Sequence, residues 1–333
     1  MLNRRTFATG VSALTLGLAW GRTSGAQTPV ASPVAEWSFT DDRGVTITLP
    51  KRPERIIAQV NSAATLWDFG VQVSGVFGPQ VLSDGSKDPL AGNIDLETIT
   101  SVGDGWEPID LERFVALDPD LIVSTTWDPV EGWLWGLGDD ATIAQAEAIA
   151  PTLAISLLDR SVVEVIARFA ELAAALGADL KSPEIQAAKT DFLAASDEVR
   201  AAVAENPDLT VAMIAGTPDE LFVEGPANGP DGRYFTELGV GLYQPQSLEG
   251  YELLSWEQAG TLAGVDLFLN DAREAAGYFS VDQLLEQPTF AALPAVQAGQ
   301  IGAWHVEYVM SYQGFASVLR ALAAYITDAS AVG

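Results

Sequence analysis

The chain of 333 residues has no cysteine and a single histidine, His305. The absence of cysteine excludes disulfides, thiolate metal sites, iron–sulfur clusters and cysteine nucleophiles. Zinc and manganese sites usually recruit several imidazoles, so one histidine disfavours a dedicated transition-metal site. His305 could belong to a Ser-His-Asp triad, but no nucleophile-elbow sequence accompanies it. We therefore expect no protein-held metal and no cofactor, and the sequence offers no catalytic residue.

Basic residues are scarce. The chain has 17 lysines and arginines and 45 aspartates and glutamates, so its formal net charge is -28. Such a field repels polyanions, so nucleic acid and anionic bilayers are disfavoured as partners. The apolar fraction of 48% is typical of a globular chain, and the length suits two domains. We expect a monomer.

The N-terminus carries a targeting pattern. Arg4 and Arg5 form a twin-arginine pair, an apolar run follows over 8–20, and Ser24-Gly25-Ala26 resembles a small-residue cleavage site. The run is too short to span a bilayer comfortably. We predict a twin-arginine signal peptide over 1–26, a linker over 27–35, and export to the periplasm or the cell surface. Without cysteine the protein cannot be a lipoprotein, and the sequence leaves open whether the signal is cleaved or acts as an anchor.

One short element occurs twice. The first copy runs from Asp110-Leu111-Glu112 to the apolar strand 121–123, and the second runs from Ser255-Trp256-Glu257 to 267–269. Each copy opens with a helix-capping residue, has a glutamate two positions on, and continues into an apolar strand. Two such units about 145 residues apart indicate two similar α/β lobes, and two lobes imply a cleft between them.

The remaining pattern fits this division. The alternation over 37–49 predicts a β-hairpin, and the order strand 55–60, helix 63–69, strand 73–76 predicts a parallel α/β sheet. An apolar stripe over 162–176 predicts a regular helix, and Ser182-Pro183 begins a second one. We predict an N-terminal α/β lobe over 36–160, a bridging helix over 161–181 and a C-terminal α/β lobe over 182–333.

Several further runs stand out along the chain: Pro53-Glu54-Arg55-Ile56-Ile57, 109–112, 117–122, Ile149-Ala150-Pro151-Thr152 and 290–301. Together, and in this order, they resemble the substrate-binding proteins of iron–siderophore and cobalamin ABC importers. The resemblance covers almost the whole mature chain. It implies two Rossmann-like lobes joined by a single long rigid α-helix, with the ligand held in the cleft between them. The chain departs from the family pattern in lacking a lipobox cysteine and in the tryptophan-rich segment 128–135.

Glu112 and Glu257 allow two interpretations. Each follows a capping residue, where a carboxylate stabilises a helix N-terminus. In the family that the chain resembles, a glutamate at this position of each lobe pairs with arginines of the membrane permease. The resemblance therefore implies that both glutamates dock the protein to a permease dimer.

Aromatic residues in polar loops suggest a ligand pocket, because ligands of α/β sheets bind beyond the strand C-termini. Packing within the lobes is the alternative for each of them, and a surface ion pair is the alternative for each arginine, although a planar guanidinium suits chelate oxygens. The predicted substrate-binding residues are Gln59, Asn61, Trp106, Trp127, Trp133, Arg233, Arg273, Trp304, His305 and Tyr308.

The sequence thus predicts a binding protein rather than an enzyme. The ligand expected from the resemblance is a ferric siderophore, which supplies its own iron coordination and so requires no histidine cluster. Cobalamin or haem within the same importer class is one alternative, and an exported enzyme with an active site between the lobes is another.

Overall fold

The structure is a computed structural model that describes residues 36–105, 109–247 and 250–332. The predicted signal peptide, the linker to residue 35 and Trp106 lie outside the described residues. Within the described part of the chain, no helix combines the length and the apolar composition that a membrane span requires.

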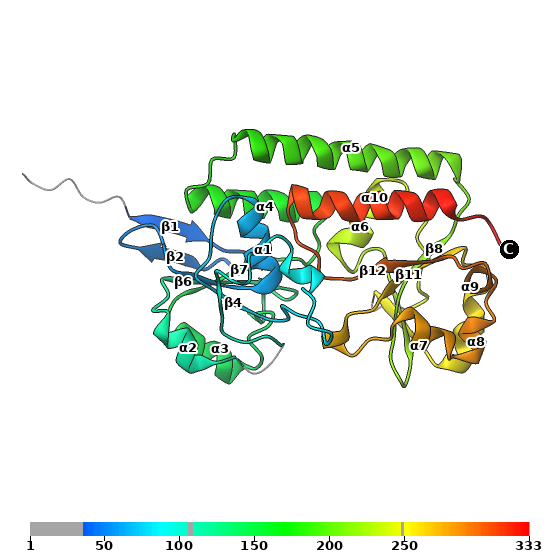
Figure 1. Ribbon diagram of the computed structural model, residues 1–333, viewed down its shortest axis with the longest axis horizontal. Coiled ribbons are helices and arrows are strands. Elements are labelled where there is room, and N and C mark those ends of the chain that lie inside the picture. Colours follow the sequence, from blue (N-terminus) through cyan, green and yellow to red (C-terminus); the bar gives the residue numbers. More distant parts are fainter. Residues whose placement is uncertain (1–35, 106–108, 248–249, 333) are drawn as a thin grey trace, which may run out of the picture. The chain divides into compact units, whose positions relative to one another are not determined.

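The first lobe is built on a five-stranded, all-parallel sheet with the strand order β5-β4-β3-β6-β7 (Figure 1). Every residue of the central strands is buried, as expected for a parallel sheet covered on both faces. Its strands are β3 (Ile56–Gln59), β4 (Gly75–Phe77), β5 (Thr100–Ser101), β6 (Leu121–Thr126) and β7 (Thr152–Ser156), and its helices are α1 (Val60–Asp68), η1 (Pro89–Ala91), α2 (Leu111–Ala116) and α3 (Asp140–Glu147).

A β-hairpin precedes this sheet, as the sequence predicted, with β1 (Trp37–Thr40) antiparallel to β2 (Thr46–Leu49). Its acidic turn is bound to the edge strand β7. The Asp41 carboxylate accepts the Ala154 N–H at 3.1 Å, and the Asp42 carboxylate accepts the Ser156 N–H at 2.8 Å. The turn therefore occupies backbone groups of an edge strand that would otherwise be exposed.

The second lobe has the equivalent strand order, β10-β9-β8-β11-β12, but its sheet is mixed. β8, β11 and β12 are parallel, whereas β9 and β10 run antiparallel to their neighbours. The short turn from Thr217 to Glu220 forces this reversal, because two strands so closely joined must be antiparallel. Its strands are β8 (Val211–Gly216), β9 (Leu221–Glu224), β10 (Tyr251–Leu254), β11 (Leu267–Asp271) and β12 (Ile301–Trp304).

Short helices dominate the connections of this lobe, and a long one closes the chain. The repeated element is confirmed as a pair of equivalent helix–strand units, although its second helix, η2, is a 3-10 helix. The helices are α6 (Pro230–Glu237), η2 (Trp256–Leu262), η3 (Glu274–Ala276), α7 (Val281–Leu285), α8 (Pro288–Ala291), α9 (Pro294–Gln297) and α10 (Tyr312–Asp328).

Two helices connect the sheets. α4 (Val162–Ala175) begins with a capping box of Ser161 and Glu164, and α5 (Pro183–Glu205) follows after the turn at Gly177, whose φ is +97°. The segment 161–181, predicted as one bridging helix, therefore contains α4 and the turn after it. In Figure 1 the helix that passes above both sheets is α5. The lobe boundaries at residues 160 and 182 stay a prediction.

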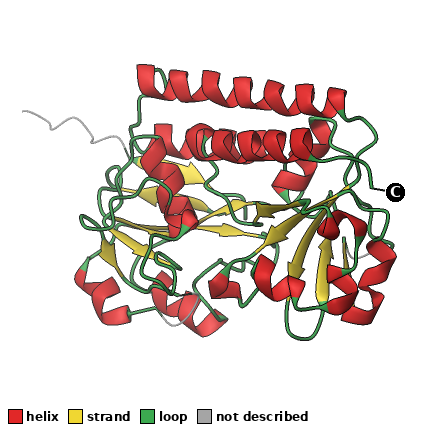
Figure 2. Cartoon of the chain, turned by 45° about the vertical axis from the view of Figure 1, so that its right-hand side comes forward, coloured by secondary structure: helices red, strands yellow, loops and turns green. Residues whose placement is uncertain are grey.

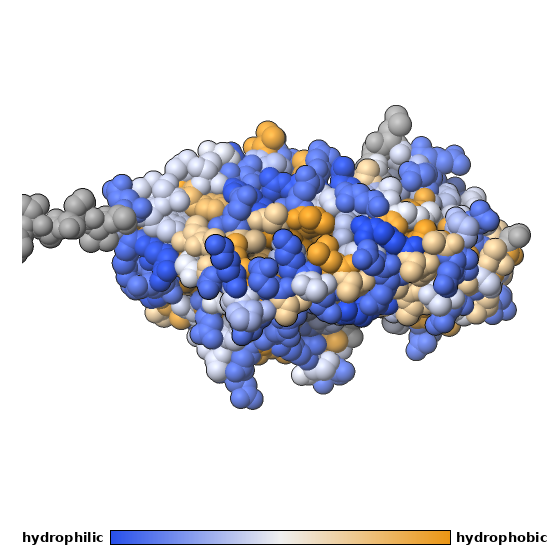
Figure 3. Space-filling view, turned by 90° about the horizontal axis from the view of Figure 1, so that it is seen from above, coloured by the Kyte–Doolittle hydropathy of each residue, from blue (hydrophilic) through white to orange (hydrophobic). Residues whose placement is uncertain are grey.

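One apolar cluster extends through both lobes. It includes Ile56 of β3, Phe169 of α4, Phe192 of α5, Val211 of β8 and Leu319 of α10. α5 and α10 lie together on one side of the sheets (Figure 2). The surface seen from that side is mostly hydrophilic with separate apolar areas (Figure 3), so the buried faces of the two helices point toward the sheets.

We predict that Phe192→Ala destabilises the protein by roughly 3–5 kcal/mol, because it leaves a cavity at the centre of this cluster. The Phe192 ring is stacked on Tyr234 at 5.6 Å between centroids and meets Tyr312 edge-on. Urea unfolding measures the change in free energy. Leu193→Ala is the control, since the neighbouring Leu193 side chain is 52% exposed and its loss should cost little. Equal losses in the two variants would contradict a central role for Phe192.

Candidate functional site

A cavity of about 430 Å³ lies where loops of both lobes meet beyond the strand ends. In each sheet the first strand of the lobe pairs with the fourth, β3 with β6 and β8 with β11, and the loops that follow β6 and β11 reach the cavity. This is the topological switch point at which open α/β sheets bind ligands. The lining residues are Trp127, Trp133, Trp135, Gly136, Gly138, Ile214, Ala215, Phe222, Glu224, Asn228, Asp271, Arg273, Ala276, Tyr278, Trp304 and Val306.

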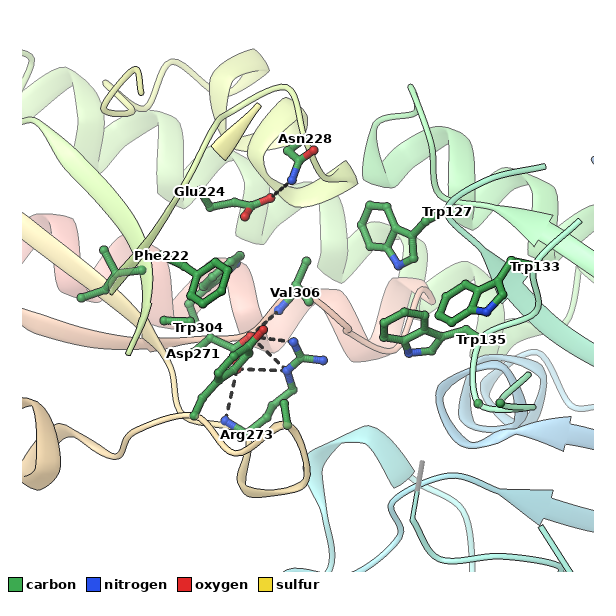
Figure 4. Close-up of a pocket in the computed structure, with 16 residues that line it drawn as sticks. Trp127, Trp133, Trp135, Phe222, Glu224, Asn228, Asp271, Arg273, Trp304 and Val306 are labelled. Atoms are coloured by element: carbon green, nitrogen blue, oxygen red, sulfur yellow. Dashed lines mark hydrogen bonds and ion pairs between the residues drawn. The ribbon is translucent and has the colours of Figure 1, made fainter. Parts of the chain in front are cut away.

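Three tryptophans of the first lobe form one wall of the cavity (Figure 4). Trp127 directly follows β6, and the rings of Trp133 and Trp135 meet edge-on at 4.7 Å between centroids. We call Trp127, Trp133 and Trp135 the tryptophan wall. Their indole faces offer broad apolar area with few rotatable bonds.

The loop that carries the tryptophan wall is held by its own hydrogen bonds. The Asp128 carboxylate accepts the N–H groups of Val130 and Glu131 at 3.0 and 2.9 Å, forming an Asx turn. The backbone N–H of Trp135 donates to the Thr125 carbonyl at 2.9 Å, and the Ser124 hydroxyl donates to the Trp135 carbonyl at 2.6 Å. The loop therefore folds back onto the end of β6.

Gly136 lets this loop approach the sheet closely. Its φ is +79°, and an added Cβ would lie 3.2 Å from the Phe77 ring and 3.3 Å from Cγ of Gln59. Both the left-handed backbone and the close contact favour glycine here. Gln59 is fully buried beneath the loop and is absent from the cavity lining.

The second lobe supplies the opposite wall. We call it the polar wall, because it carries the charged groups of Glu224, Asp271 and Arg273. Phe222 and Glu224 alternate with buried residues along β9 and so share the face toward the cavity. The Glu224 carboxylate accepts a hydrogen bond from the Asn228 side chain. Burial, with Asp231 and Asp271 nearby, raises the pKa of Glu224 to about 7 against the effect of that hydrogen bond.

Arg273 lies between two carboxylates. Its guanidinium contacts Asp271 at 2.9–3.0 Å through Nη2 and Nε and Glu307 at 2.8 Å through Nη1. The Glu307 side chain is fully buried, and its Oε1 has no hydrogen-bond partner among the described residues. Burial raises the pKa of Glu307 to about 8. We infer that Asp271, which also accepts the Arg273 and Val306 N–H groups, is the ionised partner and that Glu307 holds a proton at neutral pH.

Trp304 reaches the cavity from the end of β12, and its indole N–H donates to the buried carboxylate of Asp231 on α6. Burial raises the pKa of Asp231 to about 6, although the Trp304 hydrogen bond opposes this rise. The pair fixes the indole in place and joins β12 to α6.

Four of the predicted substrate-binding residues line the cavity: Trp127, Trp133, Arg273 and Trp304. The structure places others elsewhere. Arg233 forms an ion pair with Asp159 at 2.6 Å, and Asn61 is buried on α1. None of these placements tests ligand contact directly, so the binding roles stay predictions.

His305 and Tyr308 pack against each other with ring centroids 4.0 Å apart, and the Tyr308 hydroxyl accepts the His305 backbone N–H at 3.2 Å. Neither residue is among those lining the cavity. Burial, together with the nearby Arg273, lowers the pKa of His305 to about 4, so the imidazole is neutral at physiological pH.

Several lining residues were not predicted from the sequence, including Phe222, Glu224, Asn228 and Tyr278. For Glu224 a signal was present, since it ends the alternating run Leu221-Phe222-Val223-Glu224 just before Gly225. An acid at the end of a strand and before a glycine can lie at the carboxyl edge of a sheet. Tyr278 and Asn228 carry no comparable local signal.

The two glutamates of the repeated element are both exposed. Glu112 lies in the first turn of α2, and Glu257 lies in the first turn of η2, which packs against α8. α2 and α8 lie below the sheets in Figure 1, on the side opposite α5 and α10. Both glutamates are therefore available to a partner.

Two α/β lobes, a helical connection and a ligand-sized cavity between them define a bilobed solute-binding protein. The chain belongs to the periplasmic binding protein family, whose model matches residues 57–308. This is a family of binding proteins, which agrees with the prediction that the chain is not an enzyme. A comparison with curated proteins found no match.

Solved structures show the same fold. DesE, a ferric-siderophore receptor protein from Streptomyces coelicolor, is 36% identical, and the match covers 89% of this chain and 100% of that chain with a TM-score of 0.84. The triscatecholate siderophore binding protein FeuA from Bacillus subtilis is 16% identical, covering 87% and 98% with a TM-score of 0.63. The heme binding protein HmuT is 20% identical, covering 90% and 93% with a TM-score of 0.62. The last two similarities establish the fold alone.

We predict that Asp231→Asn changes how stability depends on pH. Because burial places the folded-state pKa of Asp231 above its ordinary value of 3.8, its contribution to stability is present below that value and is lost as the pH rises through about 6. Asparagine can still accept the Trp304 N–H and does not ionise. Relative to wild type, the variant should therefore gain stability between about pH 4 and pH 7.

Urea unfolding at several pH values measures this difference. Asp219→Asn, in the exposed turn between β8 and β9, serves as the control. Parallel pH curves for wild type and Asp231→Asn would show that the carboxylate ionises no less readily in the folded protein.

Proposed function

We propose that this protein is the extracytoplasmic binding component of an ABC importer and that it captures a ferric siderophore in the cavity between its lobes. The observation that carries the proposal is the cavity itself, in which the tryptophan wall faces a polar wall across about 430 Å³. Such a combination of apolar surface and a few placed polar groups is typical of small-molecule sites. The 36% identity to a ferric-siderophore receptor over its whole length supports the same ligand class.

A chelated ligand suits the side chains at the site. Among the described residues, no three His, Asp or Glu side chains gather as they would around a bare metal ion. A siderophore occupies the coordination sphere of its iron, so the protein needs to recognise only the organic shell. The tryptophan wall can pack on that shell, while Glu224 and Asn228 can bind its polar groups.

Haem and cobalamin remain the alternatives within the same importer class. A haem protein commonly supplies a histidine to the iron, and the one histidine of this chain is absent from the cavity lining. This observation favours the siderophore over haem.

The two exposed glutamates suggest how the protein delivers its ligand to the membrane permease. We propose that Glu112 and Glu257, one on each lobe, bind arginines of the permease dimer. Their equivalent positions in the two helix–strand units match a partner with two-fold symmetry. Export by the twin-arginine route, the absence of a lipid anchor and a monomeric state belong to the same proposal, and family membership supports an extracytoplasmic location.

We predict that ferric siderophores quench the intrinsic tryptophan fluorescence of the protein and that haem and cobalamin do not, because the ligand would lie against three indoles. Trp127→Ala and Trp133→Ala should each weaken siderophore binding by roughly tenfold or more, the loss expected for an aromatic contact in a binding site. Val130→Ala, in the same loop but 90% exposed, is the matched control and should bind as wild type does. Quenching by haem or cobalamin in the absence of any siderophore response would select an alternative ligand.

We predict that the double variant Glu112→Arg, Glu257→Arg abolishes uptake of radio-iron by cells that depend on this protein, while siderophore affinity stays unchanged. The reversal replaces two attractive contacts with the permease by repulsive ones. The double variant Glu205→Arg, Glu237→Arg, at the ends of α5 and α6 and away from α2 and η2, controls for the same change in net charge. Normal uptake by the double variant would exclude docking through these residues, and lost affinity would assign them to the ligand site or the fold.

A further inference from the structure

The cavity offers no uncompensated positive charge. Among the described lining residues Arg273 is the one cation, and two acidic residues, Glu224 and Asp271, line the same space. Asp231 lies directly behind Trp304, and Glu307 lies behind Arg273. The local balance of charge around the site is therefore neutral to negative.

The guanidinium of Arg273 is already engaged by protein groups. Its Nε and Nη2 contact Asp271, its Nη1 contacts Glu307, and its carbon Cζ lies 5.6 Å from the centroid of the Tyr278 ring. Its side chain is only 10% exposed. A guanidinium carries five N–H groups and these contacts use at most three of them, so an anionic ligand can reach the rest without displacing Asp271. Its negative charge is unfavourable there, because Asp271 already balances the single positive charge of Arg273.

Glu224 is the acidic group that can still accept a hydrogen bond from a ligand. Asn228 donates to Oε1 of Glu224, which leaves the other carboxylate oxygen without a hydrogen-bond donor among the hydrogen bonds of the described residues. The side chain lies on the cavity side of β9, across the cavity from the tryptophan wall (Figure 4). It is therefore placed to accept a hydrogen bond from a ligand group that carries N–H or a positive charge.

We propose, resting on the function proposed above, that this site selects neutral or cationic ferric chelates over anionic ones and that Glu224 determines this preference by binding a donor or cationic group of the ligand. Three hydroxamates balance the charge of Fe(III), whereas three catecholates leave the complex strongly anionic. The site thus fits a hydroxamate-type chelate with an amine or amide donor, and it rejects a tris-catecholate by electrostatic repulsion.

The ionisation of Glu224 provides a second measurement, the pH dependence of ligand affinity. The charged and titratable groups around it are Asp231 of α6, Asp271 of β11, Arg273 and Tyr278 of the following loop. A cationic ligand favours the ionised carboxylate, so binding releases the proton that the empty site still holds near its pKa of about 7. Affinity for a cationic chelate should therefore rise between about pH 6 and about pH 8.

A charge series built on one chelate tests the proposal. The probes are a ferric linear tris-hydroxamate with a terminal amine, its N-acetyl derivative and its N-succinyl derivative, which are cationic, neutral and anionic, together with a ferric tris-catecholate. We expect wild-type affinity, measured by fluorescence titration, to fall from the cationic to the anionic probe by roughly tenfold or more. The tris-catecholate should bind weakest.

Glu224→Gln keeps the shape and the hydrogen-bonding capacity of the side chain and removes its charge. The variant should lose the preference for the cationic over the neutral probe and the rise in affinity with pH, while Glu252→Gln on the adjacent strand β10, outside the cavity lining, should retain both. An anionic probe that binds wild type as tightly as the cationic one would overturn the inference and leave the proposed function intact. Failure of every ferric chelate to bind would overturn the proposed function and the inference together.

Discussion

The apolar cluster that runs through α4, α5 and α10 is the constraint on which the rest of the structure depends. Each sheet buries one face against these helices, and the same residues therefore serve the core of both lobes. Burying apolar area at ~25 cal/mol per Å² makes this shared core costly to open. The lobes cannot separate widely without exposing it, so the cavity between them is largely formed before any ligand arrives.

A preformed cavity requires rigid walls, and the two walls obtain their rigidity by different means. The tryptophan wall lies on a loop fixed by the Asx turn at Asp128 and by the close approach that Gly136 permits. The opposite wall lies at strand ends, where buried acids must be satisfied individually. Arg273 satisfies Asp271, and the Trp304 indole satisfies Asp231. Their compensation is internal, which leaves Glu224 as the acid that faces the ligand space with capacity to spare.

Local sequence patterns predicted much of the architecture. The hairpin, the first parallel sheet and the equivalence of the two helix–strand units all follow from periodicity and capping residues, which act within a few positions. The mixed sheet was not predicted, because the reversal between β8 and β9 is made by Thr217–Glu220 without the Asn-Gly or Asp-Gly signal of a tight hairpin. A regular apolar stripe over 162–176 marks α4, whereas the sequence signals the longer helix α5 mainly through Ser182-Pro183 at its start.

The candidate site was predicted in part for a physical reason. Tryptophans in polar loops, such as Trp127 and Trp133, stand out because the loop itself has too little apolar surface to cover a large indole ring. The polar wall depends on pairings between distant segments, such as Asp231 with Trp304 and Arg273 with Glu307, which no local pattern encodes. The sequence left open whether Arg273 binds the ligand or forms a surface ion pair, whereas the fold places it between the buried acids Asp271 and Glu307.

Charge acts on this protein at two length scales. The formal net charge of -28 creates a long-range field that disfavours the approach of anions, but salt screens it beyond about 8–10 Å. Inside the cavity screening is weaker, so the few groups at the site decide which ligand stays. Because Arg273 is neutralised by its neighbours, the local field has the same sign as the long-range one. A neutral or cationic chelate is therefore favoured both on approach and when bound, whereas an anionic chelate meets repulsion at both stages.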